Sequence, residues 1–191
     1  MDIDNICIKD MGYPTVGVPV NLNIKLQAMY PINDFHFVEL RGSVSPYPVL
    51  DIDTVLSETV GSKSNLNLFF DNTVSGNSYY FVIKHRNSIE TWSANPVTII
   101  GDTTSYDFTT SVNKAYGSNM ILVDGVASIY SGDVTQDGLI DASDASLVDN
   151  DGSNFVTGYV ITDVTGDELV DASDASIIDN NGYNFVTVIR P

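Results

Sequence analysis

The chain contains an internal duplication close to its C-terminal end. Residues 133–157 read DVTQDGLIDASDASLVDNDGSNFVT, and residues 163–187 read DVTGDELVDASDASIIDNNGYNFVT. The two copies agree at 18 of 25 positions, and the shared positions include every aspartate that could face a common centre. A duplication of this kind predicts two similar structural units that carry two similar sites.

Within each copy, the acidic residues follow the spacing of a twelve-residue calcium loop. Such a loop supplies oxygen ligands from positions 1, 3, 5, 7, 9 and 12 and turns sharply at position 6. The predicted ligands are Asp133, Thr135, Asp137, the carbonyl of Leu139, Asp141 and Asp144 in the first copy, and Asp163, Thr165, Asp167, the carbonyl of Leu169, Asp171 and Asp174 in the second. We therefore predict two calcium ions, one in each loop.

An alternative interpretation is a solvated acidic turn followed by a helix N-terminus, because Asp and Ser are also good capping residues. Capping explains neither the regular spacing of the acids nor their duplication. Four carboxylates around one point would also repel one another strongly without a cation between them. The calcium-loop interpretation accounts for all three features.

These residues resemble the dockerin family, whose two tandem calcium loops each lead into a single helix and carry Asp at position 12. The resemblance covers about residues 131–184, a third of the chain. It implies a secreted protein that binds two calcium ions and docks onto a cohesin partner through loop positions 10 and 11 and the helix behind them. The corresponding residues are Ala142, Ser143, Ala172 and Ser173, with Asp149, Asn150, Asp179 and Asn180 further along.

The two copies depart from the family pattern at three positions. Thr135 and Thr165 stand where the family usually has Asn or Asp. Glu168 replaces the glycine of the sharp turn, where a positive φ costs a residue with a side chain about 1 kcal/mol. We therefore predict that the second site is weaker than the first, or remodelled.

Each calcium loop is predicted to lead into a short helix. Ala142, Ala145 and Val148 form a single apolar stripe after the first loop. Gly152 and Gly182 are predicted to end the two helices as C-caps.

The first 130 residues show the alternation of β-strands. From Asn21 to Ala28, the apolar residues Leu22, Ile24 and Leu26 alternate with polar ones, which is typical of a half-buried strand. Further predicted strands are residues 3–8, 34–40, 65–71, 78–86, 90–92, 97–100, 105–109 and 120–130. We therefore predict a mainly β protein, with an antiparallel β-sandwich over residues 1–130 and a module of two calcium loops and two short helices over residues 131–191.

The charge of the chain excludes some partners. Its formal net charge is −17, and residues 131–191 carry twelve acids and one base. Such a surface repels nucleic acid and anionic membranes. Cys7 is the only cysteine, so no intrachain disulfide forms. Bound calcium would then stabilise the fold in place of disulfides. No leader and no membrane span are expected, and calcium loops of this type indicate an extracellular or cell-surface protein.

Candidate chemistry in the sandwich is sparse. His36 and His85 are predicted to lie on strand surfaces, and the acid pair Asp51 and Asp53 is typical of a loop. The aromatic residues are expected to be core, with a sugar-stacking platform as the alternative; they are Tyr47, Tyr79, Tyr80 and Trp92. Because no residue set amounts to an active site, we do not expect an enzyme.

Three functional hypotheses remain. The first is a secreted structural protein, stabilised by calcium, that self-assembles into an extracellular fibre or surface layer through a terminal strand, either Ile3 to Ile8 or Phe185 to Ile189. The second is a dockerin-type module that binds a cohesin-like partner as part of a larger secreted enzyme. The third is a carbohydrate-binding sandwich.

Overall fold

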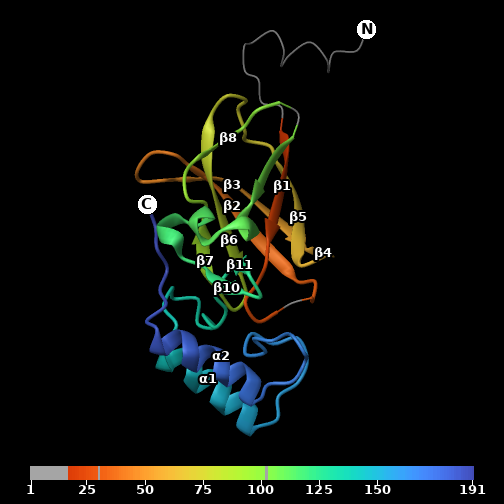
Figure 1. Cartoon of the computed structure of the whole chain (residues 1–191), viewed down its shortest axis with the longest axis vertical. Helices are drawn as coiled ribbons and strands as arrows, with labels where there is room; N and C mark the ends of the chain where they lie inside the picture. Colours follow the sequence, from red (N-terminus) through yellow and green to blue (C-terminus); the bar gives the residue numbers. More distant parts are fainter. Residues whose placement is uncertain (1–16, 30, 102) are drawn as a thin grey trace, which may run out of the picture.

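The computed structural model describes residues 17–29, 31–101 and 103–191. The predicted strand at residues 3–8 and Cys7 lie outside the described residues. The described part is mainly β, with two facing sheets and two helices gathered at one end of the molecule (Figure 1).

The first sheet has the strand order β4-β5-β1-β9. Its central strand β1 (Val18–Ile24) is antiparallel to β5 (Lys63–Phe70) and parallel to β9 (Thr104–Asp107), and β4 (Glu58–Val60) lies at the edge. The predicted alternation is confirmed, because Leu22 and Ile24 are fully buried. The strand ends at Ile24, earlier than predicted, and Leu26 makes only a single bridge to Ile129.

The second sheet faces the first. Its strands are β3 (Val49–Leu56), β2 (Phe35–Gly42), β6 (Ser78–His85) and β7 (Ser88–Trp92), in that order, with β8 (Val97–Thr98) also paired to β6. A separate hairpin consists of β10 (Ile121–Val123) and β11 (Val126–Ser128). Buried side chains from both sheets, among them Leu22, Leu40, Phe70 and Phe81, form one apolar core, so the predicted sandwich is confirmed.

Strands β3 and β4 were not predicted, because β3 carries acids where a buried strand would carry apolar residues. The Asp53 carboxylate accepts a hydrogen bond from the backbone amide of Phe69 at 2.8 Å, and Asp51 accepts one from Asn72 at 3.0 Å. These acids therefore satisfy backbone amides in and just after β5. The pair thus belongs to a strand and not to a loop.

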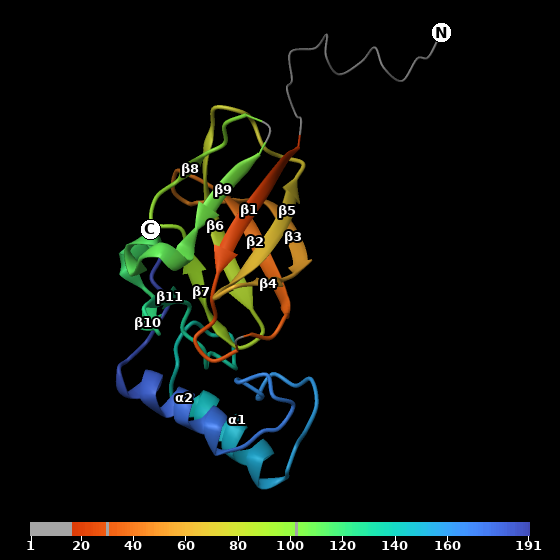
Figure 2. The ribbon, with the colours of Figure 1, turned by 45° about the vertical axis from the view of Figure 1, so that its right-hand side comes forward.

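Helices α1 (Ala142–Ser153) and α2 (Ala172–Tyr183) lie side by side below the sandwich (Figure 2). Each begins with a capping box, in which Asp141 and Asp144, or their equivalents Asp171 and Asp174, exchange hydrogen bonds with backbone amides. Neither helix of the described chain is long and apolar enough to cross a membrane.

The predicted helix ends are wrong by two residues. Gly152 and Gly182 lie inside the last helical turn, and the C-caps are Asn154 and Asn184. A Cβ on Gly182 would lie 3.4 Å from the carbonyl oxygen of Ile140, so the glycines let the opposite loop approach the helix closely.

The segment after each helix pairs with the loop of the other copy. After α2, the amide of Val188 donates to the Gly138 carbonyl at 2.8 Å, and Ile140 donates to Val186 at 3.0 Å. After α1, the amide of Val170 donates to Val156 at 3.0 Å. Residues 185–189 were predicted as a terminal strand available to another copy, but their backbone partners lie in the first loop, because the duplicated unit closes on itself reciprocally.

Candidate calcium loops and docking face

The first loop buries a carboxylate that lacks a counter-charge. The side chain of Asp133 is 2% exposed, and its Oδ2 accepts a hydrogen bond from the Gly138 amide at 3.2 Å. Its Oδ1 is buried and has no hydrogen-bond partner. Burial, together with the charges of Asp144 and Asp137, raises the pKa of Asp133 to about 7. A nearby cation would relieve all of these effects.

The other predicted ligands of the first loop bond to the backbone. Asp144 is fully buried and accepts from the amides of Val134 at 2.8 Å and Thr135 at 2.9 Å. Asp137 accepts from the Leu139 amide, and Asp141 accepts from Ser143 as the N-cap of α1. No group of three or more His, Cys, Asp or Glu side chains lies close enough to hold a metal ion in the described chain. The loop thus places Asp144 and Asp137 near enough to Asp133 for their charges to act on it, with Asp137 exposed, and Asp141 lies at the start of α1.

The second loop has the same backbone pattern but a different charge balance. Asp163 accepts from the amides of Gly166 at 2.7 Å and Glu168 at 3.1 Å, and an Arg86 nitrogen lies 3.9 Å from its Oδ2. Burial raises the pKa of Asp163, while those two amides and the arginine oppose the rise. Glu168 adopts φ +67°, so the sharp turn is kept despite the side chain.

The remaining predicted ligands of the second loop mirror those of the first. Asp174 accepts from the amides of Val164 at 2.7 Å and Thr165 at 2.9 Å, and Asp167 accepts from Leu169. Asp171 caps α2. Both loops offer only oxygen donors, the set that calcium prefers. The unpartnered Asp133 oxygen makes the first loop the better fit for a hard cation.

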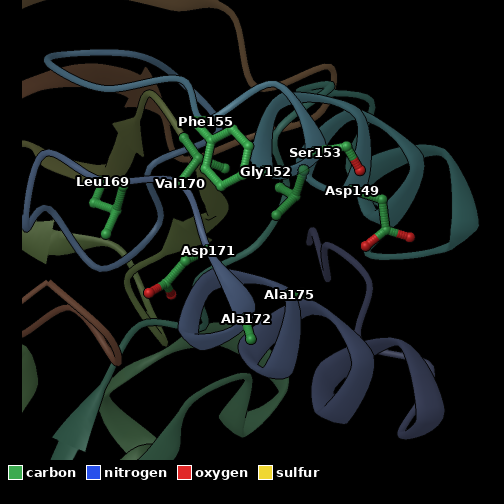
Figure 3. A pocket seen from close by; sticks show the side chains of 10 residues that line it. Asp149, Gly152, Ser153, Phe155, Leu169, Val170, Asp171, Ala172 and Ala175 are labelled. Atoms are coloured by element: carbon green, nitrogen blue, oxygen red, sulfur yellow. The ribbon is translucent and has the colours of Figure 1, made fainter.

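The residues that the dockerin resemblance assigns to docking are all exposed; they are Ala142, Ser143, Asp149, Asn150, Ala172, Ser173, Asp179 and Asn180. Four of them line two cavities that are related by the thirty-residue shift of the duplication, Asp149 and Ala172 in the first and Ala142 and Asp179 in the second. Figure 3 shows the first, of about 500 Å³, where Phe155 after α1 faces Leu169 of the second loop. In the second cavity, Phe185 and Leu139 take their places.

Both phenylalanines are strained and exposed. Phe155 and Phe185 have φ of +54° and +55°, a region that disfavours bulky side chains. Their side chains are 82% and 84% exposed. The positive φ ends each helix, because the amides of Val156 and Val186 donate to the carbonyls of Asp151 and Asn181. The two aromatic rings are no part of the core.

The two histidines were predicted to lie on strand surfaces, and this is wrong. Phe37 pairs with Lys84, so His36 and His85 lie next to each other on the inner face, with ring centroids 5.0 Å apart. Burial and the neighbouring His85 lower the pKa of His36 to about 3, and burial lowers that of His85. Both rings are therefore neutral at physiological pH.

A buried polar cluster around Asp34 joins the sandwich to the C-terminal module. The Asp34 carboxylate accepts hydrogen bonds from the Tyr159 hydroxyl at 2.6 Å, from Arg86 Nε at 2.9 Å and from His85 Nε2 at 3.1 Å. Burial raises its pKa, but these three donors outweigh burial and hold it well below the usual range. Asp34 and Tyr159 are 125 residues apart, so no local pattern could have predicted their contact.

The hydrogen-bond order Asp34–His85–Ser88 is that of a catalytic triad. His85 Nδ1 lies 3.2 Å from the Ser88 hydroxyl, but all three side chains are buried, at 3%, 2% and 1% exposure. None of them lines any of the cavities recorded for the described residues. A substrate has no access to this serine, so the arrangement supports a structural role.

The aromatic residues of the second sheet form a buried cluster. Tyr80 and Trp92 pack edge to face, with Tyr47 and Tyr116 against them and the Arg41 guanidinium 5.0 Å from the Trp92 ring centre. Trp92 is 2% exposed. The expectation of a core role is confirmed for Tyr79, Tyr80 and Trp92, whereas Tyr47 is only partly buried.

No protein-family model matches the chain, and no curated protein does. Among the solved structures similar to it are two interface mutants of a type II cohesin–X-dockerin complex from Acetivibrio cellulolyticus. In the C-terminal interface mutant, the matching chain is 16% identical with a TM-score of 0.52; the match covers 86% of this chain and 95% of that one. In the N-terminal interface mutant, the matching chain is 17% identical with a TM-score of 0.51, and the match covers 86% of this chain and 95% of that one.

These likenesses show a shared fold. The first 130 residues are about two thirds of this chain, so a match over 86% extends well into the duplicated segment.

Proposed function

We propose that the chain is a non-enzymatic docking module, in which calcium organises a dockerin-like face that binds a cohesin-like partner. The single observation that carries this proposal is the reciprocal closure of the duplicated loops, which leaves loop positions 10 and 11 of both copies exposed beside an apolar cavity. The fold likeness to a chain of a cohesin–X-dockerin complex supports it.

Calcium would be held in each loop by the oxygen donors already described. In the first loop, it would give the buried Asp133 oxygen the partner that it lacks. When bound, the ion would neutralise the loop carboxylates and so hold the N-terminus of the following helix in place. Dependence on calcium fits an extracellular setting, and we propose that the protein acts outside the cell or at its surface.

The docking proposal is tested by binding to immobilised cohesin domains in calcium and in EGTA. Because the two faces are equivalent, a single substitution leaves one of them intact, so the variant should combine Ala142→Arg with Ala172→Arg. We expect calcium-dependent binding by the natural chain and a loss of at least tenfold in the double variant. The control is Val44→Arg, which changes an exposed loop residue of the sandwich.

Absence of binding to any cohesin type in calcium would contradict the docking proposal, and so would equal binding by the natural chain and the double variant. Binding to cohesin that persists in EGTA would show that docking does not depend on calcium and would contradict that part of the proposal. Each outcome is read on a chain whose folding has been checked by circular dichroism.

Self-assembly is the second candidate function, and an exposed apolar surface favours it. Phe35, Phe37, Ile52 and Leu56 share one outer face of β2 and β3, and each is about half exposed. Strand β3 lies at the edge of its sheet, where a strand from another copy can pair. Sedimentation at high protein concentration tests this candidate: a monomer with calcium present would exclude it.

A further inference from the structure

The two loops differ in their distance from a basic side chain. Arg86 follows β6, and one of its guanidinium nitrogens lies 3.9 Å from Asp163 of the second loop. Among the described residues, no basic side chain forms an ion pair with Asp133 or with another acid of the first loop. The second loop therefore already has a protein cation beside its first ligand, and the first loop does not.

Arg86 is held rigidly in this position. Its Nε donates to Asp34 at 2.9 Å, its Nη1 donates to the carbonyl of Val160, and its guanidinium lies 4.5 Å from the Tyr159 ring centre. The side chain is only 10% exposed. Removing a guanidinium from water in this way costs free energy unless its partners are fixed. Arg86 is therefore a structural element of the contact between the sandwich and the C-terminal module.

The neighbouring residue anchors the same loop through its backbone. The Asn87 side-chain amide donates to the carbonyl of Asp163 at 2.8 Å and to that of Ile161 at 3.2 Å. A Cβ on Gly166 would lie 2.7 Å from the Met29 side chain, so the sandwich also packs closely against the loop. The start of the second loop is thus fixed by the sandwich without a metal ion.

We infer that the charge of Arg86 beside Asp163 lowers the second loop's calcium affinity relative to the first, while Asn87 holds the loop in its folded shape. This inference rests on the proposed calcium binding. A calcium ion bound by Asp163 would share that carboxylate with the guanidinium, and the two cations repel each other. Asp34 neutralises part of the arginine charge, so the expected effect on affinity is about three- to tenfold.

The two loops can be followed separately in the full chain by NMR. The Gly138 and Gly166 amides donate to the carboxylates of Asp133 and Asp163, so each amide signal reports calcium binding in its own loop. In a calcium titration of the natural chain, we expect the Gly138 signal to saturate at a lower calcium concentration than the Gly166 signal. The gap between the two signals is the ratio of the calcium concentrations at which they are half-saturated. In Arg86→Gln, this gap should narrow by about three- to tenfold, because the second loop binds calcium more tightly.

The matched control is Arg41→Gln, which makes the same change in net charge on the sandwich, where Arg41 pairs with Glu39. It should leave the gap unchanged. Arg86→Lys provides the second variant, because it keeps the charge while losing the guanidinium fork. In Arg86→Lys, the calcium affinity of the second loop should stay as low as in the natural chain. This variant therefore tests the inference even if Arg86→Gln does not fold.

Three results would overturn the inference: equal saturation of both loops in the natural chain, unchanged or weaker calcium binding by the second loop in Arg86→Gln, or tighter calcium binding by the second loop in Arg86→Lys. If neither glycine signal moves with calcium in the natural chain, the proposed function itself fails. That outcome is distinct from a failure of the Arg86 inference alone, in which both signals move but the arginine has no effect.

Discussion

The sandwich and the C-terminal module bury different kinds of side chain. The sandwich core is built from large apolar residues such as Phe70, Phe81 and Phe108, all fully buried. The module has a smaller core of valines and isoleucines, and beside it are four nearly inaccessible aspartates, Asp133, Asp144, Asp163 and Asp174. The buried carboxylate of the sandwich, Asp34, already has Arg86 beside it, whereas Asp133 of the module has no positive charge to offset its burial among the described residues.

The largest expected effect is in the sandwich. Phe81→Ala removes a fully buried ring that stacks on Phe70, with centroids 6.4 Å apart, and should lower the free energy of unfolding by about 3–5 kcal/mol. The loss should be equal in calcium and in EGTA, as measured by denaturant unfolding followed by the fluorescence of Trp92. A loss that appears only in EGTA would mean that the two regions do not differ as described.

The next effect separates the two loops. Asp133→Asn keeps the shape of the side chain but removes the charge, so it should lower the melting temperature in calcium and raise it in EGTA. At calcium concentrations a hundredfold above the dissociation constant, the lost stabilisation is about 2.7 kcal/mol. Asp163→Asn should shift the melting temperatures in calcium and in EGTA less than Asp133→Asn does, since Arg86 already faces the Asp163 carboxylate. Equal shifts in the two variants, measured by calorimetry, would contradict this order.

A smaller effect concerns acid stability, which is a property of the sandwich. The pKa of His36 falls from 6.5 to about 3 on folding. Between these values the unfolded chain binds a proton that the folded chain does not, so His36 makes stability fall as the pH drops below 6.5. The slope is at most about 1.4 kcal/mol per pH unit. His36→Leu should flatten the pH profile of denaturant unfolding, and an unchanged profile would contradict the burial of a neutral ring.

The smallest effect tests the turn of the second loop. Glu168 has a positive φ, as Gly138 has in the first loop. Glu168→Gly should therefore stabilise the module by about 1 kcal/mol in EGTA. Gly138→Ala is the converse change and should destabilise, because a Cβ there would lie 2.9 Å from the Val188 side chain. A destabilising Glu168→Gly in EGTA would show that the glutamate makes a compensating contact.

Much of this architecture could be predicted from local patterns. The duplication predicted two equivalent loops and helices, and the alternation around Leu22 predicted a buried strand. Strand β3 was missed because Asp51 and Asp53 take positions where apolar residues are expected, and only the neighbouring strand explains them.

The features that sequence reasoning missed all depend on long-range register. His36 meets His85 because β2 and β6 pair in one particular register, which neither strand reveals alone. Arg86 meets Asp163, and Tyr159 meets Asp34, only after the module has packed on the sandwich. Residues 185–189 look like a free strand until their backbone partners in the first loop are known.

The most direct test of the central claim is hydrogen exchange, measured by mass spectrometry on the full chain in calcium and in EGTA. We expect peptides from residues 132–188 to lose protection when calcium is removed, most strongly around Asp133, while peptides from residues 18–128 keep theirs. Identical exchange of the C-terminal module in both conditions would contradict the claim that calcium organises it.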